Sequence, residues 1–490
     1  MKRNCLTVLL ALTSTFCAAL VFSAEMPERP NFVLFYADDQ GYADIGCFGA
    51  VGFKTPHIDA LAAEGRRFTS FYSTTSVCSA SRTSLLTSCY PQRVSMPGVL
   101  FPTTANAATG QKPGPGKIGL HPNEVTIAKM LKDRGYATSI AGKWHLGDAP
   151  PFLPTEHGFD EYLGIPYSND MGHYDARMRL NPNNGRPPTP FYDGNKIIEE
   201  EPDQRFLTRR TTERAVDFIQ RNRDKPFFLY VPHSMPHVPL AVHPDFAGTS
   251  EHGLYGDVIQ EIDWSVGEIV KAIRENGLEE KTMIVYTTDN GAWEHQGEHG
   301  GHSGPLRSAK STLYEGGHRV PCIMYWKGQI KPKTVASEML ATLDIMPTFA
   351  KLAGATMPNR KTDGLEAWDY ISGASDVSPR KTFVYRTPGA PPRESVIRHG
   401  KWKLFLPGTY AEIAQRDNYP SEKEWQAARQ ALVTKFDHPR LYDLETDIGE
   451  SQDMSERHPE IVADLTKRLE AFNNEMQADA RPIGRWDGKN

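Results

Sequence analysis

From residue 31 onward the chain alternates short apolar runs with longer amphipathic segments. Residues 31–37 form a β-rich apolar run that ends abruptly in acidic residues, which predicts a buried strand. Similar runs lie at 136–140, 227–231 and 282–286. Apolar residues with helical spacing lie between them, at 125–134, 207–221 and 258–273. The alternation predicts an α/β fold, with a large mixed but mostly parallel central sheet that is flanked by helices.

The last part of the chain has a different pattern. Three extended segments follow one another closely, at 382–386, 394–397 and 401–405. This spacing predicts an antiparallel sheet. A helix then runs from about Pro459 to Met476, with apolar residues at helical spacing and a proline that suits its first turn. We therefore expect a catalytic α/β domain at 25–380 and a smaller C-terminal α+β subdomain at 381–490.

The first 24 residues differ in composition from the rest. Lys2 and Arg3 precede an uncharged, mostly apolar run that ends in Ser23 and Ala24. This pattern is typical of a secretory signal peptide, here residues 1–24. No later run approaches the ~20 apolar residues of a membrane span. No Asn-x-Ser/Thr sequence follows the leader. We expect an exported bacterial protein, periplasmic or secreted.

Composition narrows the class of protein further. The 490 residues include 39% hydrophobic and 10% aromatic residues, which is enough for a large buried core. The net charge is −5 and there is no basic tract, so a nucleic-acid partner is not expected. Six cysteines are too few for a disulfide framework, and two of them lie in the leader. Four remain after it: Cys47, Cys78, Cys89 and Cys322.

Oxygen-bearing side chains follow two of the predicted strands. Asp38 and Asp39 come directly after the first strand, and Asp289 and Asn290 follow the strand at 282–286. Ligands of parallel sheets bind beyond the carboxyl ends of the strands, so the four side chains could converge if the strands are neighbours. Such a set suits Ca²⁺ or Mg²⁺. The alternative is that these residues only form turns after strands.

A polar opening leads into a helical stretch at 78–87, and Cys78 would stand at the N-terminus of this helix. That position favours an anion or an activated nucleophile, because free backbone N–H groups and the helix dipole meet there. Arg82 adds a fixed charge one turn later. The alternative is an ordinary buried cysteine at a helix start.

Basic side chains near other strand ends and glycine-rich turns complete the candidate chemistry: Lys143, His145, His237 and Lys310. Each of them alone would more often be an ordinary polar residue than a catalytic one. Together with a cation site and a nucleophile at a helix N-terminus, they predict cleavage of a tetrahedral oxyanion ester. This pattern alone does not decide between sulfate and phosphate.

The chain resembles the formylglycine-dependent (type I) sulfatases, specifically the arylsulfatase A-like members, which belong to the alkaline phosphatase superfamily. The matching motifs follow in order along nearly the whole chain after the leader: 37–46, 78–87, 142–147, 164–170, 288–291, 314–317 and 441–444. Two positions depart from the pattern. Ala80 replaces a frequent proline and Ser88 a frequent glycine, and neither removes an expected catalytic group.

The resemblance implies that a formylglycine-generating maturation enzyme oxidises Cys78 to Cα-formylglycine (3-oxoalanine). Two hydroxyls of the hydrated aldehyde would then share one carbon, and one of them would attack sulfur. The cation, Ca²⁺ with Mg²⁺ as the alternative, would polarise the sulfate. Its implied ligands are Asp38, Asp39, Asp289 and Asn290.

The resemblance also implies roles for the remaining side chains. Lys143, Lys310 and Ser168 would bind sulfate oxygens, and Arg82 would stabilise the hydrate. His237, together with Lys310, would protonate the leaving alcohol. His145 would take a proton from the second hydroxyl, so that sulfate is expelled and the aldehyde restored.

Other functions remain as alternatives. A phosphomonoesterase or phosphodiesterase of the same superfamily would share the fold, and an unmodified Cys78 would leave a protein that only binds sulfated glycans. Three histidines within 293–302 suggest zinc, but the glycines among them argue against a helix that would present two of them together. As substrate we expect a sulfate ester, either a small molecule or a sulfated oligosaccharide, with a sulfated carbohydrate favoured over a free aryl sulfate.

Overall fold

The computed structural model describes residues 28–102, 117–175, 178–386, 394–413 and 433–487, together with Ser421, Lys423 and Glu424. The predicted leader at 1–24 lies outside the described residues. Within them, no helix is both long enough and apolar enough to cross a membrane.

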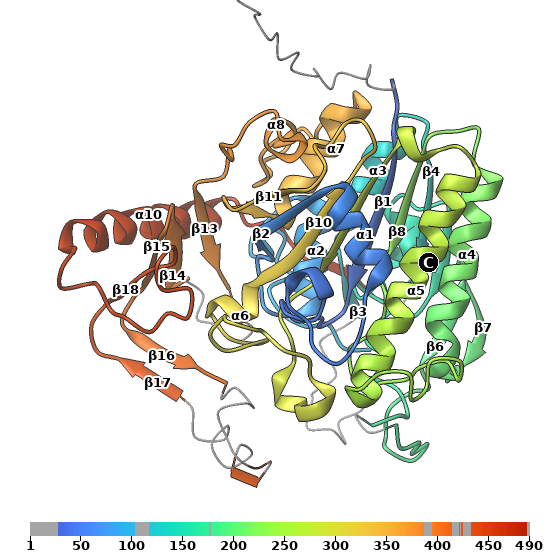
Figure 1. The fold of residues 1–490 in the computed structure, drawn as a ribbon, viewed down its shortest axis with the longest axis horizontal. Coiled ribbons are helices and arrows are strands. Elements are labelled where there is room, and N and C mark those ends of the chain that lie inside the picture. The colour runs from blue at the N-terminus through green and yellow to red at the C-terminus, as the bar shows by residue number, and fades with distance from the viewer. Residues whose placement is uncertain are drawn as a thin grey trace, which may run out of the picture.

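A large mixed sheet forms the centre of the molecule (Figure 1). The strand order is β11-β2-β10-β9-β1-β8-β4-β5-β6-β7, and β12 also pairs with β2. From β9 through β1, β8 and β4 to β5, neighbouring strands are parallel. The strand bounds are β1 Asn31–Ala37, β2 Arg66–Tyr72, β4 Ala137–Ala141, β5 Glu161–Gly164, β6 Pro190–Asp193, β7 Lys196–Glu200, β8 Phe227–Val231, β9 Thr282–Thr288, β10 Arg319–Tyr325, β11 Thr334–Ala336 and β12 Leu340–Ala341.

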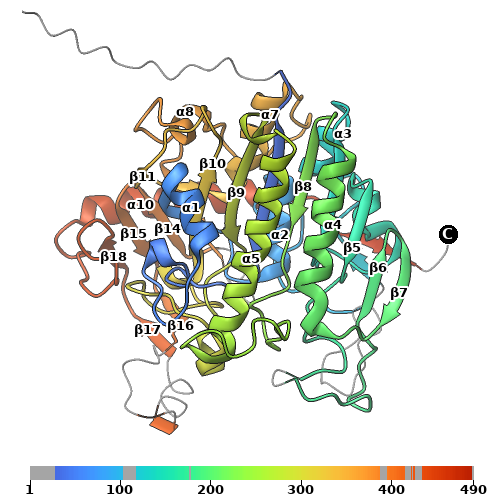
Figure 2. The ribbon, with the colours of Figure 1, turned by 45° about the vertical axis from the view of Figure 1, so that its right-hand side comes forward.

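Helices cover both faces of this sheet because the central strands are apolar on both sides. All seven residues of β1 are buried, and its side chains alternate between two hydrophobic cores. Phe32 and Leu34 pack on one face and Val33 and Phe35 on the other. The first core includes α2 Cys78–Thr87, α3 Ile127–Lys132, α7 Ile345–Ala353 and α8 Trp368–Ser372; the second includes α1 Pro56–Glu64, α4 Leu207–Arg221 and α5 Gly253–Glu275. Figure 2 shows α4 and α5 side by side over β8 and β9.

The C-terminal region forms a separate antiparallel sheet beside the β2 edge of the central sheet (Figure 1). Its order is β13-β14-β15-β18, and the helix α10 packs on β14 and β15. The bounds are β13 Thr382–Tyr385, β14 Val396–His399, β15 Trp402–Phe405, β18 Arg440–Asp443 and α10 Pro459–Ala478. Two short pairs complete the strands: β16 Gly408–Ala411 with β17 Val433–Phe436, and β3 Lys117–Gly119 with β19 Gly484–Trp486. The predicted fold class is thus confirmed.

Two strands of the central sheet, β6 and β10, were not among those that the sequence pattern predicted. β6 lies within 181–195, a stretch rich in Pro, Gly and Asn that does not show the hydrophobic pattern of a strand. β10 runs antiparallel to both of its neighbours, β9 and β2, although it stands within the central sheet. An apolar run indicates a buried strand but carries no information about its direction.

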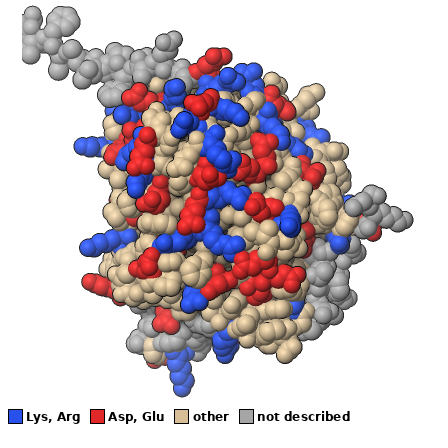
Figure 3. Space-filling model, turned by 90° about the vertical axis from the view of Figure 1, so that its right-hand side faces the viewer, with Lys and Arg blue, Asp and Glu red and all other residues tan. Residues whose placement is uncertain are grey.

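On the face drawn in Figure 3, lysines and arginines are interspersed with aspartates and glutamates. Ion pairs of α4 contribute to such a mixture, as in Arg214–Asp193 and Arg221–Glu161, both at 2.8 Å. Exposed pairs of this kind add little to stability, typically less than ~1 kcal/mol each.

A buried ionic cluster joins the C-terminal sheet to the central domain. Lys403 on β15 lies between Glu315 at 3.0 Å and Glu450 at 2.8 Å, and all three side chains are fully buried. Glu315 opens the short helix α6 Glu315–His318, and it also accepts hydrogen bonds from Tyr385 at 2.7 Å and from Tyr72 at 2.5 Å. Because a buried carboxylate is costly without a partner, this cluster couples the two regions.

Replacing Lys403 should therefore destabilise the whole chain. In Lys403→Met two buried carboxylates lose their shared cation, which should cost about 3–5 kcal/mol. Burial, opposed only in part by Lys403, raises the pKa of Glu450 to about 7. Glu450 therefore binds a proton more readily in the folded chain than in the unfolded chain. The stability that Lys403→Met loses should accordingly shrink as pH falls from about 8 to about 6. Thermal unfolding measured across that range checks this prediction.

Lys401→Met is the matched control, because the partly exposed Lys401 pairs with Asp443 at 2.6 Å. Its effect should stay below ~1 kcal/mol. Equal destabilisation by the two variants would contradict the coupling that we assign to Lys403.

Candidate active site

The predicted acidic residues meet because β1 and β9 are adjacent parallel strands in register. Ala37 pairs with Thr288, so the residues that follow both strands leave the sheet side by side. The backbone N–H of Asp39 donates to Oδ1 of Asp289 at 3.1 Å, and Nδ2 of Asn290 donates to Oδ1 of Asp39 at 2.8 Å. Asp39 adopts a positive φ of 66°, which is uncommon for a residue with a side chain and is typical of functional sites.

This group has the chemistry of a site for a hard divalent cation. Ligand atoms of Asp38, Cys78 and Asp289 lie within 4.8 Å of one another, and all three residues are buried. Oδ1 of Asp38 and Oδ1 of Asn290 are buried without a hydrogen-bond partner. Carboxylate and amide oxygens are what Ca²⁺ and Mg²⁺ prefer, so the residues present fit such a cation.

Electrostatics support the same interpretation. Burial and the neighbouring charge of Asp38 raise the pKa of Asp289. Burial also disfavours the charge of Asp38, but Lys143, His237 and Arg82 outweigh it and hold the pKa of Asp38 well below its usual value. Two adjacent buried carboxylates repel each other, and a bound cation relieves this repulsion.

Cys78 is the first residue of α2 and lies beside these carboxylates. The residue before it, Val77, offers no side-chain acceptor to the first turn, so the dipole at this helix end stays positive. The predicted helix start is therefore present. Burial raises the pKa of the Cys78 thiol to about 11 in spite of Lys143 and Lys310 nearby. At neutral pH the side chain is an uncharged thiol and hence a poor nucleophile.

Arg82, one turn along α2, is fully buried against the same acids. Its Nη2 lies 2.8 Å from Oδ2 of Asp289 and 3.4 Å from Oδ1 of Asp38. Nη1 donates to the carbonyl of Lys143 at 3.2 Å, and the guanidinium lies 5.5 Å from the ring centroid of Tyr36. The arginine thereby links α2 to the carboxyl ends of β1, β4 and β9.

Two lysines reach the acids from other segments. Lys143, just after β4, contacts Oδ2 of Asp38 and donates to Oγ of Ser168 at 3.2 Å. Lys310 donates to Oδ2 of Asp39 at 2.6 Å. Burial opposes the charge of Lys310, but Asp39 outweighs it and raises the pKa of this lysine, which therefore remains a cation.

His237 connects this cluster to Ser168. Its Nδ1 lies 2.6 Å from the carbonyl oxygen of Val238, which assigns the proton to Nδ1 when the ring is neutral. Nε2 lies 3.5 Å from Oδ2 of Asp39, and Ser168 Oγ lies 3.4 Å from the ring. Burial lowers the pKa of His237 although Asp39 opposes this shift.

One ring nitrogen of His145 has a hydrogen-bond partner and the other has none. Nε2 lies 2.9 Å from the carbonyl oxygen of Leu100, while Nδ1 is buried and has no hydrogen-bond partner. The N–H therefore belongs on Nε2, and Nδ1 is left with a lone pair that can accept a proton. Burial lowers the pKa of His145 well below its usual value. Its φ of 63° is a second left-handed conformation in the site.

The structure thus brings the predicted side chains into one connected cluster at the carboxyl ends of β1, β4, β8 and β9. Other candidates lie outside it. His233 instead bonds to Ser265 of α5 at 3.0 Å. Cys47, Cys89 and Cys322 are free thiols elsewhere in the described part of the chain. The histidines of 293–302 form no converging metal-ligand group in the residues described.

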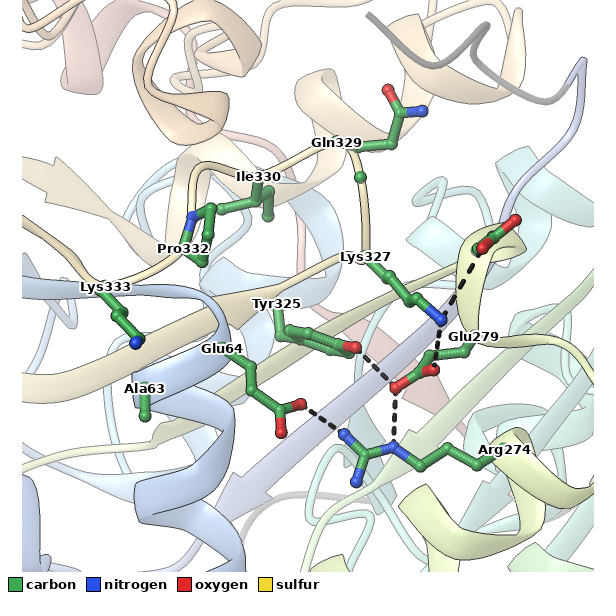
Figure 4. A pocket seen from close by; sticks show the side chains of 12 residues that line it. Ala63, Glu64, Arg274, Glu279, Tyr325, Lys327, Gln329, Ile330, Pro332 and Lys333 are labelled. Carbon is green, nitrogen blue, oxygen red and sulfur yellow. Dashed lines mark hydrogen bonds and ion pairs between the residues drawn. The ribbon is translucent and has the colours of Figure 1, made fainter. Parts of the chain in front are cut away.

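A pocket of about 760 Å³ lies at the opposite end of the sheet (Figure 4). Its lining includes the end of β10 and the residues just before β9, and several of its charged side chains pair with one another. Arg274 contacts Glu279 at 2.7 Å, and Glu279 also accepts from Tyr325 at 2.6 Å and pairs with Lys327 at 3.2 Å. None of the predicted catalytic residues lines it.

An α/β fold with acids at the ends of central parallel strands, faced by buried cations and a helix N-terminus, fits an enzyme that hydrolyses oxyanion esters. The comparisons with known proteins name the family. The sulfatase family model matches residues 30–355, and the model for the C-terminal region of aryl-sulfatase matches residues 378–487. The chain belongs to the sulfatase family, and it is a sulfuric ester hydrolase with the alkaline phosphatase-like fold of that family.

Individual relatives agree with this assignment. Arylsulfatase A from Homo sapiens is 35% identical over 94% of this chain and 90% of its own length. N-acetylgalactosamine-6-sulfatase from Mus musculus is 38% identical over 95% of this chain and 92% of its own length. The crystal structure of the PsFucS1 sulfatase from Pseudoalteromonas sp. has a TM-score of 0.78 and 26% identity, and it covers 93% of this chain and 92% of that one.

The sequence assigned no role to several residues that the structure places around the site. Glu315 was part of a recognised motif, but its partner Lys403 lies 88 positions away and carries no local signal. Trp293 lies 5.1 Å from the ring of His237 and 4.3 Å from Nζ of Lys310, measured to its ring centroid. Asp170 follows Ser168 by two residues and has a buried carboxylate oxygen without a partner.

Adding Ca²⁺ or Mg²⁺ to chelator-treated protein should raise its unfolding temperature. A cation that binds only the folded chain stabilises it by about 2.7 kcal/mol at a hundred times its Kd. The shift should vanish in Asp289→Asn, which removes one ligand charge. Asp160→Asn, with its half-exposed pair to Lys132 at 2.6 Å, should respond like the unchanged protein. Identical shifts in the two variants would rule out the proposed ligand set.

Proposed function

We propose that the protein hydrolyses sulfate monoesters of carbohydrates through a formylglycine at position 78 and a divalent cation. The observation that carries this proposal is the buried cluster itself. Cys78 opens a helix beside Asp38 and Asp289, and Lys143 and Lys310 are close enough for their charges to act on its thiol. An uncharged thiol in this place is a poor nucleophile. Oxidation to the aldehyde would supply, on hydration, one hydroxyl to attack sulfur and a second to release sulfate.

The cation would be held by Asp38, Asp39, Asp289 and Asn290. When bound, it would supply Lewis-acid polarisation of the sulfate group. Ca²⁺ takes six to eight oxygen ligands in flexible geometry, and the four protein oxygens leave positions for substrate. We propose Ca²⁺, with Mg²⁺ as the alternative.

Lys143, Lys310 and Ser168 would hold the sulfate oxygens. The two lysines reach the acids from different segments, and Ser168 accepts a hydrogen bond from Lys143. The lysines bring positive charge where the ester and its transition state carry negative charge. Arg82 is fixed by Asp289 and Asp38, so it would act from an unchanging position on the group at residue 78.

His237 would donate the proton that the leaving oxygen needs. The contact between Nδ1 and the carbonyl of Val238 orients the ring, so Nε2 is the atom that gains and loses the catalytic proton. Asp39, 3.5 Å from Nε2, favours the charged ring, whereas burial disfavours it. Such opposing influences suit a group that must release its proton during the reaction.

His145 would act as the base. Its Nδ1 is free to accept, and burial keeps the ring neutral over the physiological pH range. The carbonyl of Leu100 fixes Nε2, and the N–H of Leu100 donates to Oγ of Ser79, the second residue of α2, at 3.0 Å. The base is therefore tied to the helix that carries residue 78.

Relatives support a carbohydrate as the leaving group. One relative is named N-acetylgalactosamine-6-sulfatase, and a similar solved structure, 25% identical with a TM-score of 0.72, is a complex with k-i-k-neocarrahexaose. The proposal includes export through the leader at 1–24 and conversion of Cys78 by a formylglycine-generating enzyme.

Cys78→Ala should abolish turnover of sulfate esters, because no other group in the cluster can supply both hydroxyls. Mass spectrometry of the tryptic peptide 68–82 should give the mass of an aldehyde in place of a thiol. Hydrolysis of 4-nitrophenyl sulfate and of 4-nitrophenyl phosphate, compared on one preparation, distinguishes a sulfatase from a phosphatase. Substantial sulfatase activity in Cys78→Ala, or a faster phosphate reaction, would overturn the proposal.

His237→Gln should impair poor leaving groups most. An alcohol of a sugar needs a proton as it departs, whereas 4-nitrophenolate leaves readily without one, so kcat should fall by about 10²–10⁴ for a sugar sulfate and far less for the aryl ester. His233→Gln is the matched control, a buried histidine near His237 in sequence that bonds to Ser265. An equal loss with both esters would mean that His237 does not act as the acid.

A further inference from the structure

Trp293 is held at the rim of the catalytic cluster by two catalytic side chains. It follows Asn290 by three residues, and the carbonyl of the preceding Ala292 accepts from the N–H of Lys310 at 2.9 Å. Its ring lies 5.1 Å from that of His237, at an interplanar angle of 47°, and Nζ of Lys310 is 4.3 Å from its centroid. A cation and an imidazole thereby fix the orientation of the indole.

The burial of these residues indicates which of them meets the rest of the substrate. His237 is 3% exposed and Lys310 is 5% exposed, whereas Trp293 is only half-buried. The predicted proton donor and sulfate ligand are therefore deep, and the indole reaches toward solvent beside them. A leaving group bonded to the oxygen that His237 protonates would extend past Trp293.

Asp170 provides a second, independent observation at the same place. It is half-buried in the segment that carries Ser168, and its Oδ1 is buried without a hydrogen-bond partner. Its carboxylate is close enough to His237 for its charge to act on that ring. The backbone around it is fixed, because Arg186 donates to the carbonyl of Asp170. A buried acceptor that lacks a protein donor is satisfied by water or by a ligand that brings a donor, and Asp170 is positioned to accept from a ligand beside His237.

We propose that Trp293 and Asp170 form the leaving-group subsite and that it takes a pyranose ring with free hydroxyls. The apolar C–H face of the sugar packs on the indole, and Oδ1 of Asp170 accepts a hydrogen bond from a ring hydroxyl. This inference rests on the proposed function and narrows its substrate class. Because a carboxylate repels a second anion, the hydroxyl near Asp170 must be free and not sulfated.

An aryl ester lacks the hydroxyl that Asp170 would bind, so a change at Asp170 should affect sugar sulfates and aryl sulfates differently. Asp170→Asn keeps the shape but weakens the acceptor, so kcat/KM should fall about tenfold or more for a monosaccharide sulfate, chiefly through KM. For 4-nitrophenyl sulfate it should change less than about twofold, since nothing bonds to Asp170. Trp293→Ala should raise KM for both esters, and Trp293→Phe should restore most of the loss.

The substrates are 4-nitrophenyl sulfate and a panel of monosaccharide sulfates, which includes galactose 6-sulfate and N-acetylgalactosamine 6-sulfate. Asp175→Asn is the control for Asp170, because it is another acid of the same loop that pairs with the exposed Arg179 at 2.6 Å. Trp402→Phe, on β15, is the control for the indole. Both controls should leave kcat/KM unchanged.

Equal losses with the sugar and the aryl ester in Asp170→Asn would overturn the subsite while leaving the sulfatase proposal intact. If the unchanged enzyme hydrolyses neither ester, the proposed function fails instead, and binding decides the subsite separately. Isothermal titration of the panel into Cys78→Ala should then give an affinity that Asp170→Asn lowers about tenfold. If no member of the panel binds Cys78→Ala, or if Asp170→Asn leaves the affinity unchanged, the assignment of the subsite is wrong.

Discussion

The constraint on which this structure depends is the burial of three carboxylates at the ends of two neighbouring strands. Asp38, Asp39 and Asp289 are removed from water, and such charges persist only if cations and hydrogen bonds compensate them. Arg82, Lys143 and Lys310 meet this need from α2, from the segment after β4 and from the segment before α6. Charge compensation thus sets the positions of the groups that would bind sulfate.

The same logic extends to the C-terminal sheet. Lys310 stands five residues before Glu315, the acid that Lys403 on β15 compensates. The segment with Lys310, the lysine that we propose to bind sulfate, is therefore anchored at one end by Asp39 and at the other by Lys403 of the second sheet. Sequence comparison divides the chain into two matched regions, but electrostatically they form one unit around the site.

Local patterns predicted the strands β1, β4, β8 and β9 and the acids that follow two of them, because buried strands and their ends leave signals within a few residues. The convergence of those acids depends on the pairing of Ala37 with Thr288, a contact between residues 251 positions apart that no local pattern encodes. Family motifs supplied that information indirectly. Asp170 lay in the motif at 164–170 and Trp293 in the segment at 293–302, but neither was given a role, because a single aromatic or acidic residue has no periodicity and its partners come from other segments.

The burial of Cys78 has a consequence for the order of events during synthesis. All ten residues of α2 are buried in the finished fold, and the thiol is 3% exposed. If Cys78 is converted as proposed, a maturation enzyme has to draw the peptide around residue 78 into its own active site before α2 packs. Conversion and folding would then compete in time. A chain that folds first would keep its thiol, so one culture would yield two populations with the same fold, in proportions set by folding speed, and only the converted population would turn over sulfate esters.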